Sequence, residues 1–255
     1  RVLGKPGDFA KYYYEQGADE LMFMDVVASL YERNSLHDII SETAKSIFIP
    51  ITVGGGIRTL SDIKKILRAG ADKISINTAA VKRPEFIREA SEEFGSSTIV
   101  VAIEAIKNTD NKFHAFIDNG REFTGVEVVE WAQQLESLGA GELVVTSVDN
   151  EGTGKGINID LISSISSAVT IPIIAHGGVG KMENVARLLE SQVIDAVAIG
   201  AALHYETIKH LNSNSHDHEE GNVDFLKSGK NVQNLTPFQL SDLKKYLHSK
   251  SIYCR

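Results

Sequence analysis

Three short segments of this 255-residue chain recur at an almost constant distance along it. The first two pairs are offset by 122 residues and the third by 123: residues 17–21 with 139–143, 53–57 with 175–179, and 72–77 with 195–200. Three separate pairs in nearly one register indicate an internal duplication. We therefore expect two related halves that fold in the same way.

Short apolar or β-branched runs alternate with amphipathic stretches, which is the pattern of βα units around a parallel sheet. Seven runs are predicted to be strands, at residues 20–25, 49–53, 73–77, 98–104, 142–147, 171–175 and 196–200. Helices are predicted to open at Ser61 and at Pro84, and to span 126–138, 159–168, 183–189 and 236–248. Because 42% hydrophobic residues suit one large core, we predict an α/β fold, a single (β/α)8 TIM barrel over residues 1–255.

The duplication also predicts what lies outside the residues given. A half-barrel holds four βα units, so the second to fourth strands correspond to the sixth to eighth, and the strand that ends at Glu104 is the fifth. Its counterpart would lie ahead of Arg1, so we expect the first strand upstream of this chain. Residues 212–234, rich in Asn, Ser, Gly and charge, are predicted to form a flexible insertion. Its run 216–220 holds crowded metal-ligand types, but a solvated loop is favoured and no metal site is expected.

Charge and cysteine usage exclude several classes of partner. A formal charge of −8 gives no general attraction to nucleic acid or to anionic lipid. The longest apolar runs have the length of strands and are far short of a membrane span. The single Cys254 excludes an intrachain disulfide, so a cytoplasmic protein is expected.

Glycine runs mark the same position in both halves. Gly54-Gly55-Gly56 follows an apolar strand, and Gly177-Gly178 follows its counterpart. Backbone N–H groups can converge on an anion at such turns, although a tight βα turn would look the same. Each glycine run is followed one strand later by a turn of small residues, which adds Asn77 and Thr78 to the first site and Gly200 and Ala201 to the second. Two anion sites on one rim predict an elongated substrate with two phosphates.

Other polar residues fall where predicted strands end. Glu104 can act as a general acid or base if burial raises its pKa, or it can be a structural partner for a neighbouring group. Asp25 and Asp149 are candidates for binding substrate hydroxyls or for capping the next loop. The run that contains Thr146, Glu151 and Gly152 can close over a polar ligand. His176 either contacts a phosphate or fills the turn, and no serine lies in a nucleophile elbow.

These segments together resemble the cyclase subunit of imidazole glycerol phosphate synthase. The resemblance covers nearly the whole chain except residues 212–234, and rests on residues 17–25, 49–58, 69–80, 97–104, 139–156 and 171–181. It implies a TIM barrel in which ammonia from a glutaminase subunit passes through the core to a bisphosphate. The substrate is phosphoribulosyl-formimino-aminoimidazole carboxamide ribotide. The products are imidazole glycerol phosphate and aminoimidazole carboxamide ribotide, and no cofactor is implied.

The resemblance also implies residue roles. Glu104 matches one of two catalytic aspartates, and the other belongs to the first strand. Glu20, Lys73 and Glu142 match three members of a charged ring on the ammonia path, and Asp72 matches a residue that faces the glutaminase. The alternative for these four residues is that they form solvated ion pairs at the end of the barrel.

Three departures from the family pattern leave other functions open. Glu104 and Glu151 stand where aspartates are usual, and His176 stands where a serine is usual. An added methylene can move a catalytic carboxylate by about 1 Å, enough to cost on the order of a hundredfold in rate. The alternatives are a paralogue that delivers ammonia to a sugar nucleotide for surface polysaccharide, a non-catalytic ammonia conduit, and the sister isomerase of histidine synthesis.

Overall fold

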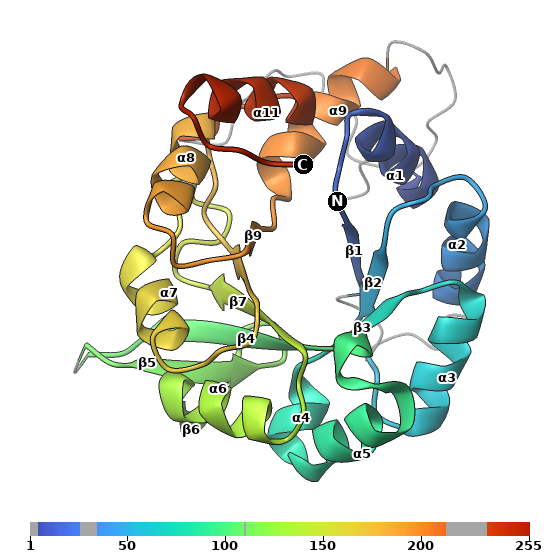
Figure 1. Ribbon diagram of the computed structural model, residues 1–255, viewed down its shortest axis with the longest axis vertical. Coiled ribbons are helices and arrows are strands. Elements are labelled where there is room, and N and C mark those ends of the chain that lie inside the picture. The colour runs from blue at the N-terminus through green and yellow to red at the C-terminus, as the bar shows by residue number, and fades with distance from the viewer. Residues whose placement is uncertain (1–4, 26–34, 110, 213–233) are drawn as a thin grey trace.

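The computed structural model describes residues 5–25, 35–109, 111–212 and 234–255. Seven parallel strands form one curved sheet surrounded by helices (Figure 1). In sheet order they are β1 (Leu21–Met24), β2 (Ile51–Gly54), β3 (Lys73–Ile76), β4 (Ile99–Lys107), β7 (Glu142–Ser147), β8 (Ile173–His176) and β9 (Ala196–Val197). All seven predicted strands are present, and the predicted α/β barrel is confirmed. Within the described residues β1 and β9 each pair on one side only.

The helices lie outside the sheet, as Figure 1 shows. They are α1 (Pro6–Glu15), α2 (Ser35–Ala44), α3 (Leu60–Ala69), α4 (Thr78–Lys82), α5 (Glu85–Phe94), α6 (Val128–Ser137), α7 (Ile159–Ser166), α8 (Met182–Glu190), α9 (Ala201–Asn212) and α11 (Leu240–Ser249), with a short 3-10 turn η1 (Ser96–Thr98). The first and last parts of the described chain meet where α1 contacts α9. In the described parts of the chain, no helix is both long and apolar enough to cross a bilayer.

Several predicted helix starts were wrong by a few residues. The cap of α3 is Thr59 and not Ser61, because the Thr59 hydroxyl accepts the Asp62 N–H while the Asp62 carboxylate accepts the Thr59 N–H. Helix α5 begins at Glu85, and Pro84 is the residue just before it. The helix predicted over 126–138 begins at Val128, and the one predicted over 236–248 begins at Leu240. The predicted insertion and its run 216–220 lie outside the described residues, apart from the two end residues.

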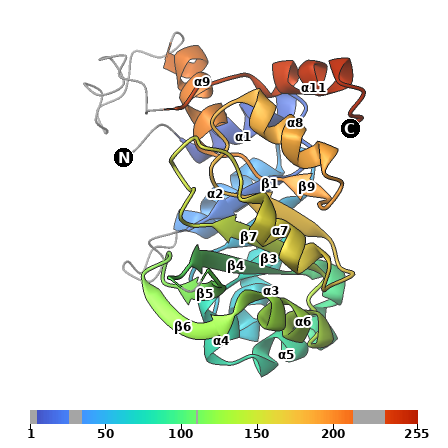
Figure 2. The same ribbon diagram turned by 90° about the vertical axis from the view of Figure 1, so that its left-hand side faces the viewer.

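The predicted alternation of strands and helices is interrupted at one place. A hairpin of β5 (Phe113–Ile117) and β6 (Glu122–Glu127) follows β4 directly and pairs with it in the antiparallel sense. Figure 2 shows both strands beside β4. The residues between Glu104 and the helix predicted over 126–138, for which no element was predicted, therefore extend the sheet beyond the end of β3.

The duplication reappears in the hydrogen bonds. The Asp72 carboxylate accepts the N–H of Ile51 at 2.8 Å, and the Asp195 carboxylate accepts the N–H of Ile173 at 2.9 Å. In both halves an aspartate that precedes one strand therefore binds the first residue of the strand before it. The two predicted halves are built by the same local contacts.

Alternate residues of the central strands face two different cores. Val101, Ile103 and Val145 belong to the large cluster packed against the helices. The neighbours Val100, Ala102 and Val144 form a separate small cluster with Met22 and Ile174 inside the curve of the sheet. Side chains alternate along a strand, so the inward series continues to Glu104 on β4 and Thr146 on β7.

Candidate active site at the carboxyl ends of the strands

The predicted substrate-binding residues lie in or just after the carboxyl ends of the parallel strands. Along the sheet they are Asp25 after β1, Gly55 and Gly56 after β2, Asn77 and Thr78 after β3, Glu104 in β4, Thr146 in β7, Asp149, Glu151 and Gly152 after β7, His176, Gly177 and Gly178 at β8, and Gly200 and Ala201 after β9. The carboxyl ends of parallel strands meet at one rim, which is where (β/α)8 enzymes hold their substrates. The fold therefore gathers this set on one side of the barrel.

Three of these side chains form a row across neighbouring strands, here called the carboxyl-end row. Glu104 pairs with Thr146, and Thr146 pairs with His176. The Thr146 hydroxyl and the His176 Nδ1 are 3.1 Å apart and share a hydrogen bond. A carboxylate, a hydroxyl and an imidazole thus lie at one level above the inward apolar cluster.

The carboxylate of Glu104 is half-buried, and the β5–β6 hairpin holds it through a hydrogen bond. Its Oε2 accepts the N–H of Gly120, in the turn of the β5–β6 hairpin, at 2.6 Å. Burial raises the pKa of Glu104, hydrogen bonds from Gly120 and Asn77 act to lower it, and the charges of Glu151 and Asp118 raise it further, with a net rise. A carboxyl with a raised pKa can both donate and accept a proton nearer to neutral pH, which suits acid and base catalysis.

The loop after β7 brings a second carboxylate to the row. Burial lowers the pKa of His176, and the negative charge of Glu151 opposes that change. The charge of Glu151 also raises the pKa of Glu104, so this carboxylate is near enough to both ends of the row to act on each. His176 is therefore held mainly as neutral imidazole, able to accept or donate through its second ring nitrogen.

The two repeated glycines serve backbone packing. Gly55 and Gly177 have φ of 103° and 95°, which side chains rarely adopt. A Cβ at Gly55 would collide with the carbonyl oxygen of Asp25, and a Cβ at Gly177 would collide with that of Ser147. Ser147 lies 122 residues after Asp25, so the duplicated halves also repeat this contact. The tight-turn interpretation of the glycines is supported, and anion binding at them stays a prediction.

Several other predicted residues already have structural contacts. Asp149 accepts the N–H of Lys107 at 2.9 Å, which fits its predicted alternative as a capping residue. The Asn77 amide donates to the Phe116 carbonyl at 3.4 Å, and the Thr78 hydroxyl accepts the Asp118 N–H at 3.5 Å. The hairpin is therefore fastened to the turn after β3.

Turns at the second glycine site are fixed in a similar way. The Gly178 carbonyl accepts the N–H of Gly156 at 2.7 Å. Gly200 starts the first turn of α9, where its carbonyl accepts the N–H groups of Leu203 and His204, while Ala201 is exposed. Gly56 and Gly152 are exposed as well. At the exposed residues Gly56, Gly152 and Ala201, the backbone at the rim is accessible to solvent.

The hairpin supplies site residues that the sequence interpretation missed. Gly120 binds Glu104 directly, and Asp118 influences it through its charge. The signal was present, because Asp118-Asn119-Gly120 lies between two runs of alternating apolar residues, and such turns favour hairpins. All three residues have positive φ, a conformation that Asp, Asn and Gly adopt more readily than other residues.

At the opposite end of the barrel, three side chains form an amino-end charge cluster of Glu20, Lys73 and Glu142. The Lys73 Nζ lies 3.0 Å from Glu20 and 3.1 Å from Glu142. Burial acts to lower the pKa of Lys73, but its two carboxylate partners outweigh burial and raise it. Burial raises the pKa of Glu142, Lys73 acts to lower it, and the charges of Glu20 and Asp195 raise it further, with a net rise. The predicted ring members therefore do contact one another.

Comparison with known proteins now decides the family. The family model described as "Histidine biosynthesis protein" matches residues 1–209. The chain is 52% identical over 183 residues to imidazole glycerol phosphate synthase subunit HisF of Legionella pneumophila, covering 72% of this chain and 86% of that protein. It is 44% identical over 225 residues to the HisF subunit of Methanococcus vannielii, covering 80% of this chain and 83% of that protein.

The chain belongs to the histidine biosynthesis protein family. The resemblance predicted from the sequence motifs is thereby confirmed. The matched residues of this family member include every predicted site residue, from Glu20 to Ala201. Helix α11, which follows the undescribed segment, lies outside the match.

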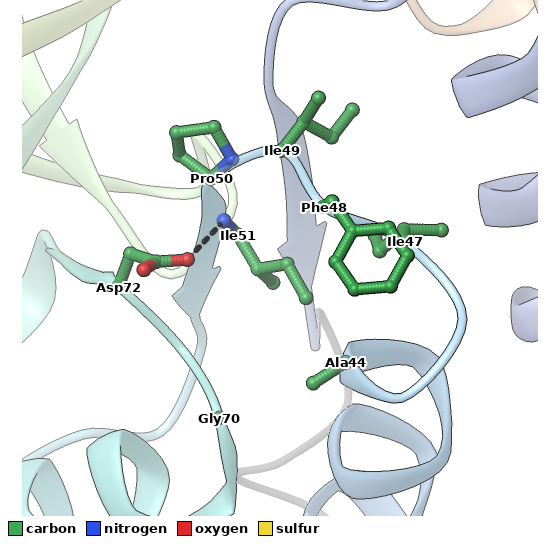
Figure 3. Close-up of a pocket in the computed structure, with 8 residues that line it drawn as sticks. All are labelled: Ala44, Ile47, Phe48, Ile49, Pro50, Ile51, Gly70 and Asp72. Carbon is green, nitrogen blue, oxygen red and sulfur yellow. Dashed lines mark hydrogen bonds between the residues drawn. The ribbon is translucent and has the colours of Figure 1, made fainter.

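This family member also has a shallow hollow of about 330 Å³ at the amino ends of its strands. Figure 3 shows Asp72 and Phe48 on the two sides of Ile51, with Asp72 bound to the Ile51 N–H. The Phe48 side chain is 81% exposed, although its ring contacts Tyr14. The exposed ring of Phe48 and the apolar residues Ile47 and Ile49 beside it line this hollow.

Proposed function

We propose that the chain is the ammonia-dependent cyclase and lyase that converts phosphoribulosyl-formimino-aminoimidazole carboxamide ribotide to imidazole glycerol phosphate and aminoimidazole carboxamide ribotide. The observation that carries the proposal is the carboxyl-end row of Glu104, Thr146 and His176 at the rim of a barrel 52% identical to a HisF subunit. The names of both relatives support the cyclase. They give no support to amidation of a sugar nucleotide.

In this proposal Glu104 exchanges protons with the substrate. Its raised pKa brings the acid form closer to neutral pH, and the Gly120 N–H fixes the direction of the carboxylate. A glutamate is one methylene longer than the aspartate that is usual in the family. The hydrogen bond from Gly120 holds the carboxylate of this longer side chain in place. His176 and Glu151 bind polar groups of the substrate beside it, and the turns at Gly55 and Gly177 bind its two phosphates.

A glutaminase subunit docks at the amino ends of the strands in the same proposal. Phe48 and Asp72 are the contacts we assign to it, supported by the exposure of Phe48 and the hollow between them. Ammonia then enters past the amino-end charge cluster and crosses the inward apolar cluster to reach Glu104. The walls there are short side chains such as Ala102 and Val144, which suit a small neutral molecule. The predicted cytoplasmic location is kept as part of this proposal.

The direct test supplies the chain with an ammonium salt and the ribulosyl substrate, without any glutaminase. The expected result is release of aminoimidazole carboxamide ribotide, which chromatography detects. A folded chain that binds the substrate but releases no product would contradict the proposal. Product formation that is the same in a Glu104→Gln variant would show that Glu104 is neither the acid nor the base of the reaction.

A further inference from the structure

The β5–β6 hairpin carries three rings on the face that Glu104 shares. Phe116 pairs with Glu104 across β4 and β5, and Phe123 pairs with Phe116 across β5 and β6. Residues directly opposite in antiparallel strands point to the same face, so these rings lie on the side of the Glu104 carboxylate. The Phe123 ring centroid is 5.4 Å from both Phe116 and His114.

Packing of the hairpin does not account for these rings. Ala115 and Ile117 occupy the opposite face, are buried, and lie on the strand that contacts α6. Phe123, in contrast, is 57% exposed, although it stands at the predicted substrate rim. An exposed ring clustered with two others beside a half-buried carboxylate indicates a surface that a ligand covers.

We propose that His114, Phe116 and Phe123 form an aromatic platform that binds the planar aminoimidazole carboxamide ring of the substrate. This inference rests on the proposed function for the identity of the ring. Flat heteroaromatic rings gain free energy by stacking on aromatic side chains. The amino and carboxamide N–H groups of this ring are donors, and the acceptors Glu104 and Asp118 lie next to the platform.

The distance between the phosphate and the ring of a ribotide fits a platform beside Asn77 and Thr78. The hairpin is hydrogen-bonded to Asn77 and Thr78, the residues predicted to hold one phosphate. A ribotide whose phosphate binds there has its ring one ribose away, beside the hairpin. A phosphate on the platform itself is disfavoured by the carboxylates of Glu104, Asp118 and Glu151.

Binding of two ligands, one with the ring and one without it, to the wild type and to three variants tests the platform. The probes are aminoimidazole carboxamide ribotide and ribose 5-phosphate, which lacks the ring, titrated into the full chain by calorimetry. Phe123→Leu keeps an apolar side chain without a ring, Phe123→Tyr keeps the ring, and Tyr253→Leu is the control at an exposed ring far along the chain. We expect Phe123→Leu to weaken ribotide binding by about tenfold or more, with much smaller effects on ribose 5-phosphate and in the other two variants.

If the wild type and Phe123→Leu bind the ribotide with equal affinity, the platform proposal is wrong. It is also wrong if the wild type binds ribose 5-phosphate as tightly as the ribotide. Turnover of the ribulosyl substrate separates this failure from failure of the proposed function. Turnover without a ring effect leaves the cyclase proposal standing and the platform wrong. A ring effect without turnover leaves the platform standing as a heteroaromatic site.

Discussion

The two ends of the barrel interior use the same residue type in opposite ways. Glu142 at the amino end and Glu104 at the carboxyl end both lie on inward positions, and burial raises the pKa of both. Glu142 has Lys73 at 3.1 Å, whereas the charged neighbours that act on Glu104 are the carboxylates Glu151 and Asp118. A cation in contact favours the ionised form of a carboxylate, whereas neighbouring carboxylates without a cation favour the protonated form.

The difference shows that burial alone does not define a catalytic carboxylate. The neighbours decide its role, and they come from elements far apart in the chain. At the amino end the cation belongs to β3. At the carboxyl end a backbone N–H from the hairpin takes the place of a cation.

The largest predicted effect comes from removing one carboxylate at each end. Glu104→Gln keeps the shape and the bond from Gly120 but cannot exchange a proton, so we expect ammonium-dependent kcat to fall by about 10²–10⁴-fold. Glu142→Gln is expected to keep most of that turnover. Steady-state assays with saturating ammonium measure both, and comparable losses in the two variants would erase the distinction between the ends.

Removing the cation should turn the amino end into a cluster of like charges. Lys73→Met leaves Glu20 and Glu142 without their partner, so we expect a loss of about 1–3 kcal/mol in the free energy of unfolding. Urea denaturation measures it. The control Lys45→Met removes an exposed lysine paired with Glu42 and should cost at most about 0.5 kcal/mol.

The same lysine also separates the two sources of ammonia. In the complete synthase, glutamine-dependent turnover of Lys73→Met should fall by more than ammonium-dependent turnover, because only the first uses the amino end. Equal losses would place the entry of ammonia elsewhere.

A smaller effect concerns stability and pH at the carboxyl end. Because the folded pKa of Glu104 is raised, the folded state holds this proton more tightly than the unfolded state. The resulting stabilisation is complete below the ordinary glutamate pKa and is lost as pH rises through the folded pKa. Relative to wild type, Glu104→Gln should therefore gain stability as pH rises from the ordinary glutamate pKa through the raised folded pKa. Parallel unfolding curves with no pH trend would contradict the assignment.

The smallest effect is expected at His176. Its lowered pKa means that the unfolded state binds the proton more readily, so wild-type stability falls as pH drops through the window between the folded pKa and the ordinary histidine pKa. His176→Asn keeps a partner for Thr146 but does not titrate, and should be less sensitive to acid. Thermal unfolding at about pH 7.5 and about pH 5.5 compares the two proteins, and identical shifts would show that His176 is solvated.

The sequence predicted the strands because periodicity and the repeat report local pattern. It could not give the partners of Glu104. The register that sets Glu104 beside Thr146 and His176 arises between strands, and the approach of Glu151 depends on the path of a loop. The hairpin was missed for a different reason. Its turn at Asp118-Asn119-Gly120 is visible in the sequence, but the predictions were of βα units and not of hairpins.

The duplication had a similar limit. It placed Gly55 and Gly177 at equivalent turns, but spacing alone cannot show that each packs against a carbonyl of the preceding βα unit. Structural need and ligand binding leave the same glycine pattern, so only coordinates or a bound ligand separate them.

A crystal structure of the chain with the ribulosyl bisphosphate substrate tests the central claim most directly. The account predicts one phosphate at the turns of Gly55 and Thr78, the other at the turns of Gly177 and Ala201, and the reacting carbons between them within reach of Glu104. A ligand that occupies only one of these turns, or that binds away from the carboxyl ends of the strands, would contradict it.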